Sequence, residues 1–297
     1  MIKEIQAKTI LGTNKDPDAW FGVRYNMNIY RGCEHRCIYC DSRSSCYQIE
    51  NFDDVLVKIN ALELLEKELS SKRIIGTVGT GSMSDPYTHA ETGYNMTGRA
   101  LEIIAAHKFP VHINTKSDLI LRDMDILKTI SNVRASVSFT VTTIDDKLSA
   151  MLEPGAPVSS RRFQAMRMFA DAGIYTGVLM MPLLPFVEDN LENITAIVEQ
   201  TRNCGGRYVI PGFGMSMRDR QRAYYYNKLN KLFPGLSSKY MKTYKDNYIC
   251  PSPKEKELKE VFQQLCKDYG LLTDTRQLEL EMKPYSNVKS NSQIKLF

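Results

Sequence analysis

Short apolar runs alternate with longer amphipathic stretches through the middle of the chain. The apolar and β-branched runs predict strands at 23–30, 74–78, 109–115, 134–141, 174–181 and 208–210. Apolar residues that recur every three or four positions predict helices at 53–69, 97–107, 122–130, 159–172 and 188–204. This alternation of six strands with helices indicates parallel βαβ units.

Six such units fit either an incomplete barrel or a six-stranded doubly wound sheet, and periodicity alone does not separate the two. A loop with three cysteines directly follows the first predicted strand, at residues 33–40. Barrel enzymes carry their chemistry on the loops that follow the strands. The cysteine loop and the family resemblance described below favour the barrel. We therefore predict an α/β fold, a partial (βα)6 TIM barrel, over residues 23–212.

The two ends of the chain lack this alternation of strand and helix patterns. Residues 1–22 predict an irregular lead-in that Trp20 and Phe21 attach to the core. Residues 213–280 predict a C-terminal helical extension, with an amphipathic helix at 254–269. Residues 281–297 are polar and predict a disordered tail.

Composition is that of an ordinary globular protein. The chain has 297 residues, of which 43% are hydrophobic and 25% charged. The chain has no run of 18 apolar residues that would predict a membrane span, and its N-terminus lacks the apolar core of a signal peptide. We expect no membrane contact and a cytoplasmic location. The net charge of +5 permits a polyanionic partner without requiring one.

Three of the seven cysteines, Cys33, Cys37 and Cys40, are spaced C-x3-C-x2-C. Thiols this close favour a shared metal centre over a disulfide framework. Three thiolates would leave one iron of a four-iron cluster open for chemistry. The alternative is a zinc site with Cys46 or His35 as fourth ligand, in a non-enzymatic nucleic-acid adaptor. Structural zinc sites usually pair two C-x2-C units and no second unit is present, so the cluster is favoured.

The cysteine spacing, with Tyr39 before the last cysteine, resembles the signature of the radical S-adenosylmethionine (SAM) superfamily. Further motifs resemble spore photoproduct lyase and the DNA repair photolyase-like proteins. These motifs lie at 28–33, 37–40, 84–87, 91, 115–117, 122–123 and 153–157. The resemblance extends over about residues 24–212. It implies an enzyme that cleaves SAM reductively, forms a 5′-deoxyadenosyl radical and takes its electron from a reductant such as flavodoxin or ferredoxin.

The resemblance also implies roles for particular residues. Cys33, Cys37 and Cys40 would hold a [4Fe-4S] cluster, and Tyr39 would lie near the adenine of SAM. The remaining SAM contacts would come from the loop after the second strand and from two further strands: Thr80, Gly81, Ser82, Ser84, Lys116 and Ser138. A cation at a strand end can pair with the SAM carboxylate. The alternatives are a solvated lysine at 116 and a buried, backbone-bonded hydroxyl at 138.

One position departs from the lyase pattern. The lyase has a cysteine that returns a hydrogen atom to the product radical, and the corresponding residue here is Ser82. A serine O–H is a much poorer hydrogen-atom donor than a thiol. The role could pass to a tyrosine or to one of the remaining cysteines, which are Cys46, Cys204, Cys250 and Cys266. Each of these cysteines could equally be a small buried hydrophobe.

Three segments suggest partners. Arginines and tyrosines at 218–228 could grip phosphates and stack bases, or form a helix with inward tyrosines and solvated arginines. Arg161 and Arg162, at a helix start, could bind a substrate phosphate or form surface ion pairs. The chain ends on a short peptide that resembles those with which bacterial DNA proteins dock on the sliding clamp, through Gln293, Ile294, Leu296 and Phe297.

The resemblance leaves the substrate open. A nucleic-acid lesion is one hypothesis, and a protein or a small molecule is the other. His89, His107 and His112 have no metal-ligand spacing, and we expect them to be structural.

Overall fold

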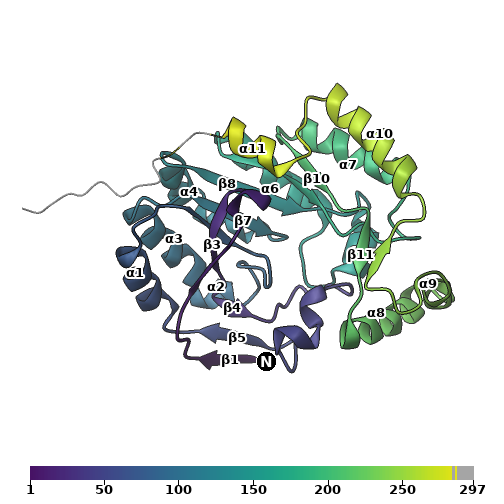
Figure 1. The fold of residues 1–297 in the computed structure, drawn as a ribbon, viewed down its shortest axis with the longest axis horizontal. Helices are drawn as coiled ribbons and strands as arrows, with labels where there is room; N and C mark the ends of the chain where they lie inside the picture. Colours follow the sequence, from purple (N-terminus) through teal and green to yellow (C-terminus); the bar gives the residue numbers. More distant parts are fainter. Residues whose placement is uncertain (283–284, 286–297) are drawn as a thin grey trace, which may run out of the picture.

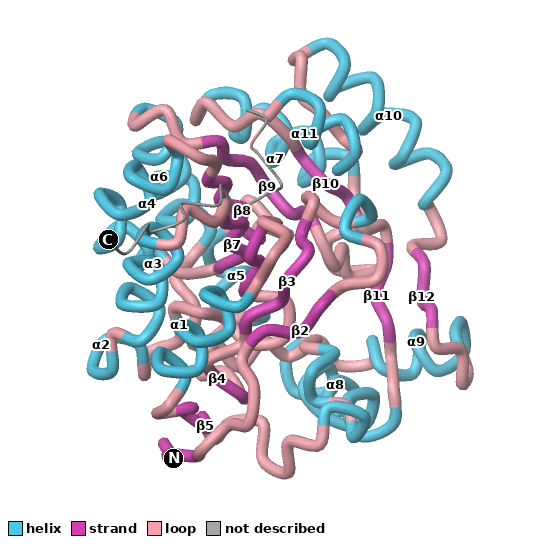
Figure 2. The backbone as a smooth tube through the Cα atoms, turned by 60° about the vertical axis from the view of Figure 1, so that its left-hand side comes forward, coloured by secondary structure: helices cyan, strands magenta, loops and turns pink. Residues whose placement is uncertain are grey.

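The computed structural model describes residues 1–282 and 285 and has a curved parallel sheet at its centre (Figure 1). The parallel strands are β3 (Val23–Met27), β6 (Thr77–Thr80), β7 (Val111–Thr115), β8 (Ala135–Thr140), β9 (Tyr175–Met180) and β10 (Val209–Pro211). They lie side by side in chain order, and Figure 2 shows β7, β8, β9 and β10 following one another across the sheet. A doubly wound sheet would reverse its order at a switch point. The prediction of a partial six-stranded barrel is therefore confirmed.

Helices cover the outer face of this sheet (Figure 1). They are α1 (Ala61–Ser71), α2 (Glu91–Tyr94), α3 (Met96–Ala106), α4 (Met124–Ser131), α5 (Asp146–Leu152), α6 (Ser159–Asp171) and α7 (Leu191–Asn203). Alternate strand residues such as Val111, Ile113 and Val137 belong to the apolar core shared with these helices. Since side chains alternate along a strand, the residues between them face the barrel interior. Those inward residues of β7 and β8 are polar: His112, Asn114, Ser136, Ser138 and Thr140.

The N-terminal part differs from the prediction. Residues 1–22 are not all irregular, because β1 (Ile2–Ile5) and β2 (Leu11–Thr13) lie within them. The predicted strand 23–30 divides into β3 and β4 (Tyr30–Arg31), and the predicted helix 53–69 begins instead as β5 (Val55–Lys58). Strand β5 pairs with β1 and β4 in a small separate sheet. Local periodicity gave no sign of these partners, which lie far away in the sequence.

The C-terminal extension is largely helical, as predicted. It contains α8 (Asp219–Leu232), α9 (Leu236–Tyr244), α10 (Glu255–Asp268) and α11 (Thr275–Glu281). An antiparallel pair of strands, β11 (Gly214–Ser216) and β12 (Ile249–Pro251), was not predicted. No helix in the described part of the chain is both long and apolar enough to span a bilayer.

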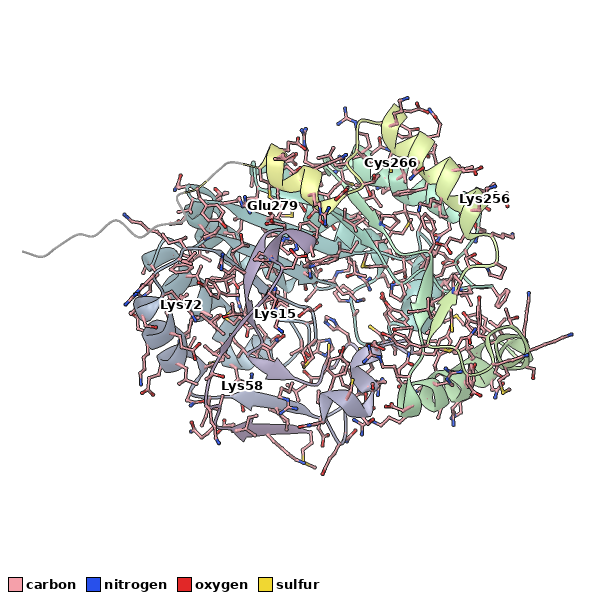
Figure 3. The ribbon with its side chains drawn as sticks, viewed as in Figure 1. Lys15, Lys58, Lys72, Lys256, Cys266 and Glu279 are labelled. Carbon is pink, nitrogen blue, oxygen red and sulfur yellow. The ribbon has the colours of Figure 1, made fainter. Side chains whose placement is uncertain are left out.

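Helix α11 closes the end of the barrel at which the parallel strands begin (Figure 3). Its Glu279 pairs with Arg134 at 2.7 Å, and its Leu278 packs with Phe21 and Tyr208. Phe21 is fully buried and Trp20 packs partly buried beside it, as expected. The predicted tail and its clamp-like peptide lie outside the described residues, apart from the tail's first two residues and Tyr285.

The loop after β9 carries a buried carboxyl group that pairs with no cation of the described part of the chain. Glu188 accepts hydrogen bonds from the Thr142 hydroxyl at 2.7 Å and from the Leu184 N–H at 3.0 Å. Burial raises the pKa of Glu188 to about 8, and the negative charge of Glu153 adds to the shift. The folded chain therefore holds a proton here at pH values where the unfolded chain has released it.

This shift predicts that stability declines as pH rises between about 4.5 and 8. Over that window the folded state binds more protons at Glu188 than the unfolded state does, at about 1.4 kcal/mol per pKa unit. Glu188→Gln should remove this part of the slope and be the more stable protein at pH 8. Urea unfolding of the metal-free chain at pH 5, 6.5 and 8 measures the difference. Parallel pH profiles for both proteins would contradict the assignment.

Candidate active site

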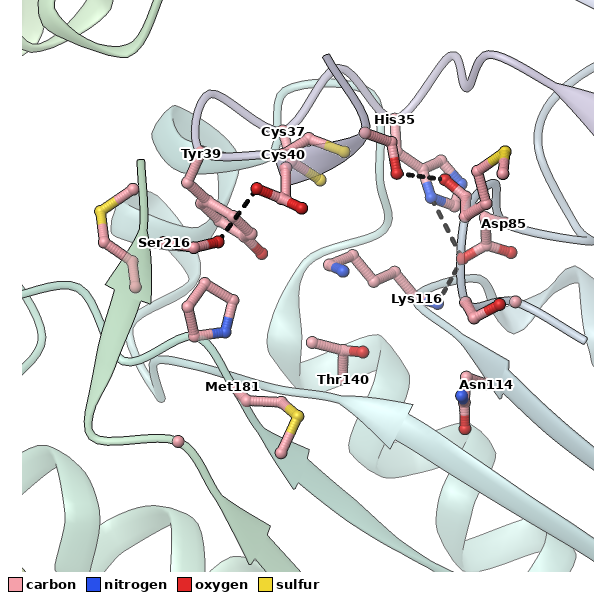
Figure 4. A pocket seen from close by; sticks show the side chains of 18 of the residues that line it. His35, Cys37, Tyr39, Cys40, Asp85, Asn114, Lys116, Thr140, Met181 and Ser216 are labelled. Carbon is pink, nitrogen blue, oxygen red and sulfur yellow. Dashed lines mark hydrogen bonds and ion pairs between the residues drawn. The ribbon is translucent and has the colours of Figure 1, made fainter. Parts of the chain in front are cut away.

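A cavity of about 640 Å³ opens at the carboxyl ends of the barrel strands (Figure 4). Three parts of the chain line it: the cysteine loop, the ends of the strands, and the β11–β12 pair of the C-terminal extension. The residues that line it include Cys33, His35, Cys37, Tyr39, Cys40, Gly81, Ser82, Asp85, Asn114, Lys116, Thr140, Met181, Phe213, Met215 and Ile249. The chain thus brings residues more than 200 positions apart to a single site.

The three motif cysteines line this cavity together and form no disulfide. Burial raises the pKa of the Cys37 and Cys40 thiols. Burial also acts on Cys33, but the charge and hydrogen bond of His35 outweigh it and hold the pKa of Cys33 below its usual value. Within residues 1–282 and 285, no three His, Cys, Asp or Glu side chains stand close enough to hold one metal ion. The zinc set with Cys46 or His35 as fourth ligand is therefore not assembled in this structure, and the three motif thiols share the cavity without converging on one ion.

A glycine sets the entry to the cysteine loop. Gly32 has φ +84°, and a Cβ there would lie 2.0 Å from the Asp54 carbonyl oxygen. The next residue, Cys33, donates its backbone N–H to the Phe52 carbonyl at 3.3 Å. The turn therefore places the first cysteine against the segment before β5.

A second support comes from the loop after α5. The Gly155 N–H donates to the His35 carbonyl at 3.0 Å, and the Ile38 N–H donates to the Leu152 carbonyl at 2.9 Å. A Cβ on Gly155 would lie 2.0 Å from the Glu34 carbonyl oxygen. The two loops thus dock backbone to backbone, which explains the glycine in the 153–157 motif.

His35 and Asp85 form a buried pair beside Cys33, with Nδ1 of His35 3.3 Å from Oδ2 of Asp85. Burial would lower the pKa of His35, but Cys33 and Asp85 raise it to about 10. Asp85 also accepts hydrogen bonds from the Thr115 hydroxyl and the Lys116 N–H, both at 2.7 Å. His35 was predicted only as an alternative zinc ligand, and its pairing with Asp85 was missed. Its position between two motif cysteines was the only available signal.

Lys116 points into the cavity, where Figure 4 shows it between the cysteine loop and the strand ends. Its Nζ lies 4.0 Å from Oε1 of Glu153 and 5.8 Å from the centre of the Tyr39 ring. The Tyr39 hydroxyl donates a hydrogen bond to the same carboxylate. Lys116 is therefore not the solvated lysine of the alternative interpretation.

Glu153 lies behind Lys116 and is itself 1% exposed. Its second oxygen pairs with Arg162 at 2.5 Å, and Arg162 is fully buried. The prediction that Arg162 binds a substrate phosphate or forms a surface pair is wrong, because α6 directs this side chain into the core. Arg161, next to it, forms the expected surface pair with Asp118.

The other predicted SAM contacts divide into three groups. Gly81 and Ser82 line the cavity, whereas Thr80 and Ser84 are buried beside it without lining it. Ser138 lies deeper in the barrel, where its hydroxyl bonds to the Tyr208 hydroxyl at 2.6 Å. Ser138 is thus buried, as in the alternative interpretation, but its hydroxyl bonds to a side chain and not to the backbone.

The remaining cysteines lie outside the cavity lining. Cys204, Cys250 and Cys266 are buried, as expected of small hydrophobes, and Cys46 is exposed. No described cysteine outside the motif therefore faces the site.

Two of the three histidines that were expected to be structural have such contacts: His107 bonds to Glu66, and His112 lies within the barrel.

The arginines of 218–228 bind the protein itself. Arg220 donates to the Arg43 carbonyl at 2.7 Å, and Arg222 donates to the Asn247 carbonyl at 2.8 Å. Tyr225 is fully buried. The structure thus favours the helix with inward tyrosines, although its arginines fix loops instead of being solvated.

Comparisons with known proteins agree with this geometry. The family model of the radical SAM superfamily matches residues 27–198. An uncharacterised protein of Mycobacterium tuberculosis H37Rv is 30% identical over 92% of this chain and 82% of its own length. An uncharacterised protein of Methanocaldococcus jannaschii is 30% identical over 68% of this chain and 73% of its own length. A spore photoproduct lyase variant with bound AdoMet and dinucleoside spore photoproduct shares the fold, with TM-score 0.68 and 15% identity over 91% of this chain and 80% of its own.

The buried Glu153–Arg162 pair gives a stability prediction. Glu153→Gln leaves the Arg162 guanidinium buried without its counterion, which should lower the free energy of unfolding by about 3 kcal/mol. The matched control is Asp118→Asn, which breaks the exposed pair with the neighbouring Arg161 and should cost less than about 1 kcal/mol. Urea unfolding of the metal-free proteins measures both. Equal losses in the two variants would contradict the central role given to Glu153.

Proposed function

This chain belongs to the radical SAM superfamily, and from that premise we propose that Cys33, Cys37 and Cys40 hold a [4Fe-4S] cluster beside a SAM molecule in the cavity. The chain is a radical SAM enzyme, and enzymes of this family use both cofactors. The non-enzymatic zinc adaptor is therefore wrong. When bound, the reduced cluster supplies the electron that cleaves a C–S bond of SAM and yields a 5′-deoxyadenosyl radical.

One observation carries the proposal: three free thiols and the Lys116 ammonium face the same cavity. Thiolates are the ligands that iron–sulfur clusters take. An ammonium suits the SAM carboxylate. Aromatic and thioether side chains such as Tyr39, Phe213 and Met215 complete a lining that fits a flat base and a sulfonium. The protein's share of the reaction is to orient SAM and to keep water from the reacting atoms.

The cysteine assignment predicts a selective loss of iron. Cys33→Ser, Cys37→Ser and Cys40→Ser should each lower bound iron and sulfide after anaerobic reconstitution. Each should also reduce the yield of 5′-deoxyadenosine from SAM and dithionite to background. Cys46→Ser is the matched control and should behave like the unmodified protein, since Cys46 lies outside the cavity lining. A reconstituted, reduced protein that leaves SAM intact would overturn the proposed function.

For the substrate, we favour a nucleic acid. The net charge of +5 is compatible with a polyanion, and the fold neighbour was crystallised with a dinucleoside photoproduct. Ser82 lines the cavity, in place of the hydrogen-donating cysteine that the resemblance implies. A hydroxyl in that position favours a reaction that ends differently from the lyase's own repair.

A nucleic-acid substrate predicts salt-sensitive binding. The apparent Kd of the full chain for a DNA duplex should rise roughly ten-fold between 50 and 200 mM salt if two phosphates are neutralised. Fluorescence anisotropy with a labelled duplex measures this, with a neutral dextran of similar size as the control competitor. Salt-independent or absent binding would instead favour the alternative, a protein or small-molecule substrate.

The proposal also covers the electron donor, the location of the enzyme and its contact with the sliding clamp. A flavodoxin or ferredoxin would supply the electron, because the described residues include no second set of clustered cysteines. We place the enzyme in the cytoplasm, where thiols stay reduced. The clamp-like peptide at 293–297 would tie it to DNA, and a pull-down with the sliding clamp tests that contact.

A further inference from the structure

Asn114 lies on the side of the cavity that faces the cysteine loop (Figure 4). It is the fourth residue of β7, next to the strand end that carries Lys116, and it is 9% exposed. Its amide group has two ends with different surroundings. The oxygen faces inward to the barrel, where Oδ1 lies 2.7 Å from Nε2 of His112. Among residues 1–282 and 285, no atom accepts a hydrogen bond from Nδ2.

In this structure the oxygen of the Asn114 amide, and not its nitrogen, faces His112. An amide oxygen only accepts hydrogen bonds, so Nε2 of His112 must carry the hydrogen. Burial lowers the pKa of His112 to about 3, so the ring is neutral and its Nδ1 is an acceptor. The Ser136 hydroxyl lies 2.7 Å from Nδ1 and donates to it. Both ring nitrogens of His112 therefore have a hydrogen-bond partner, and the Asn114 oxygen faces the interior of the barrel.

The surroundings keep the ring of His112 in place. Phe21 stacks on it with ring centres 3.9 Å apart and planes 14° apart. The Ser138 hydroxyl lies 3.5 Å from Nε2 and is itself bonded to Tyr208. Both Phe21 and Tyr208 belong to the core cluster under α11. The polar interior of the barrel is thus in continuous contact from the closing helix up to the cavity.

We propose that Asn114 binds SAM by donating a hydrogen bond from Nδ2 to an oxygen of that ligand, and that His112 is a positioning residue that holds the amide in this orientation. The inference rests on the proposed function, which puts SAM in this cavity. Both the ribose and the carboxylate of SAM offer such oxygens, and both are acceptors.

Two substitutions at Asn114 separate a donor from an acceptor. Asn114→Leu keeps the approximate shape and removes both polar atoms, whereas Asn114→Asp keeps an oxygen for His112 and presents a second oxygen to the cavity. If Nδ2 is a donor to SAM, both variants should raise the Kd for SAM by roughly 5- to 100-fold, because an acceptor of the ligand is left unpaired. Equilibrium dialysis of the reconstituted protein with labelled SAM measures the Kd. Unchanged SAM binding by Asn114→Asp would overturn the donor assignment.

A pair of substitutions at His112 tests the positioning role. His112→Leu removes the donor to Oδ1 and frees the amide to rotate, so SAM binding should weaken several-fold. His112→Gln places an amide nitrogen near the position of Nε2 and should restore most of the affinity. Equal affinities for these two variants would show that His112 has only a packing role. Thermal melting of each variant establishes that the comparison concerns folded protein.

The controls distinguish this inference from the proposed function. Iron and sulfide content and the spectrum of the reduced cluster should be the same in the unmodified protein and in both Asn114 variants. If the unmodified protein fails to bind SAM, the proposed function fails. If it binds and cleaves SAM and Asn114→Leu binds SAM equally well, only the role of Asn114 fails.

Discussion

The buried carboxylate of Glu153 is the interaction on which the site depends. One oxygen meets the Tyr39 hydroxyl and the Lys116 ammonium, and the other meets the Arg162 guanidinium. These partners come from the cysteine loop, the end of β7 and helix α6. A carboxylate that is 1% exposed is stable only if such partners surround it. Because an unpaired buried carboxylate would be unstable, the cysteine loop, the end of β7 and helix α6 must all come together around it. The cavity lies between the cysteine loop and the end of β7.

The backbone around Glu153 extends this constraint to the cysteines. Because Gly155 and Leu152 hydrogen-bond the cysteine loop directly, the loop cannot shift without breaking contacts that also hold the carboxylate. Beneath the site, the interior of the barrel contains a layer of polar side chains where barrels usually have branched apolar ones. That layer is satisfied internally by pairs such as His112–Ser136 and Ser138–Tyr208. A polar interior can then orient groups at its upper surface, which an apolar interior could not do.

The sequence predicted the parts of the structure that local pattern determines. The six parallel strands, their helices and the joint position of Cys33, Cys37 and Cys40 follow from periodicity, spacing and resemblance. The small sheet of β1, β4 and β5 was missed because its pairing joins residues more than 50 positions apart between β1 and β5 and at least 25 positions apart between β4 and β5. The inward direction of Arg162 was missed for a similar reason: two adjacent arginines at a helix start look alike, and only the partners Glu153 and Asp118 separate them. Asn114 and His112 carried no motif, and their roles follow only from the barrel interior.

The charged side chains around the cavity differ in how far the protein itself pairs them. His35 is paired with Asp85, and Arg162 with Glu153, so these charges are largely satisfied within the protein. Lys116 differs, because its 4.0 Å separation from Glu153 exceeds hydrogen-bond distance. Its ammonium is attracted to the carboxylate yet keeps its donors for a ligand. Among the described residues that line the cavity, Lys116 is therefore a cation that an entering carboxylate could reach, and Asn114 lies two residues earlier in the chain.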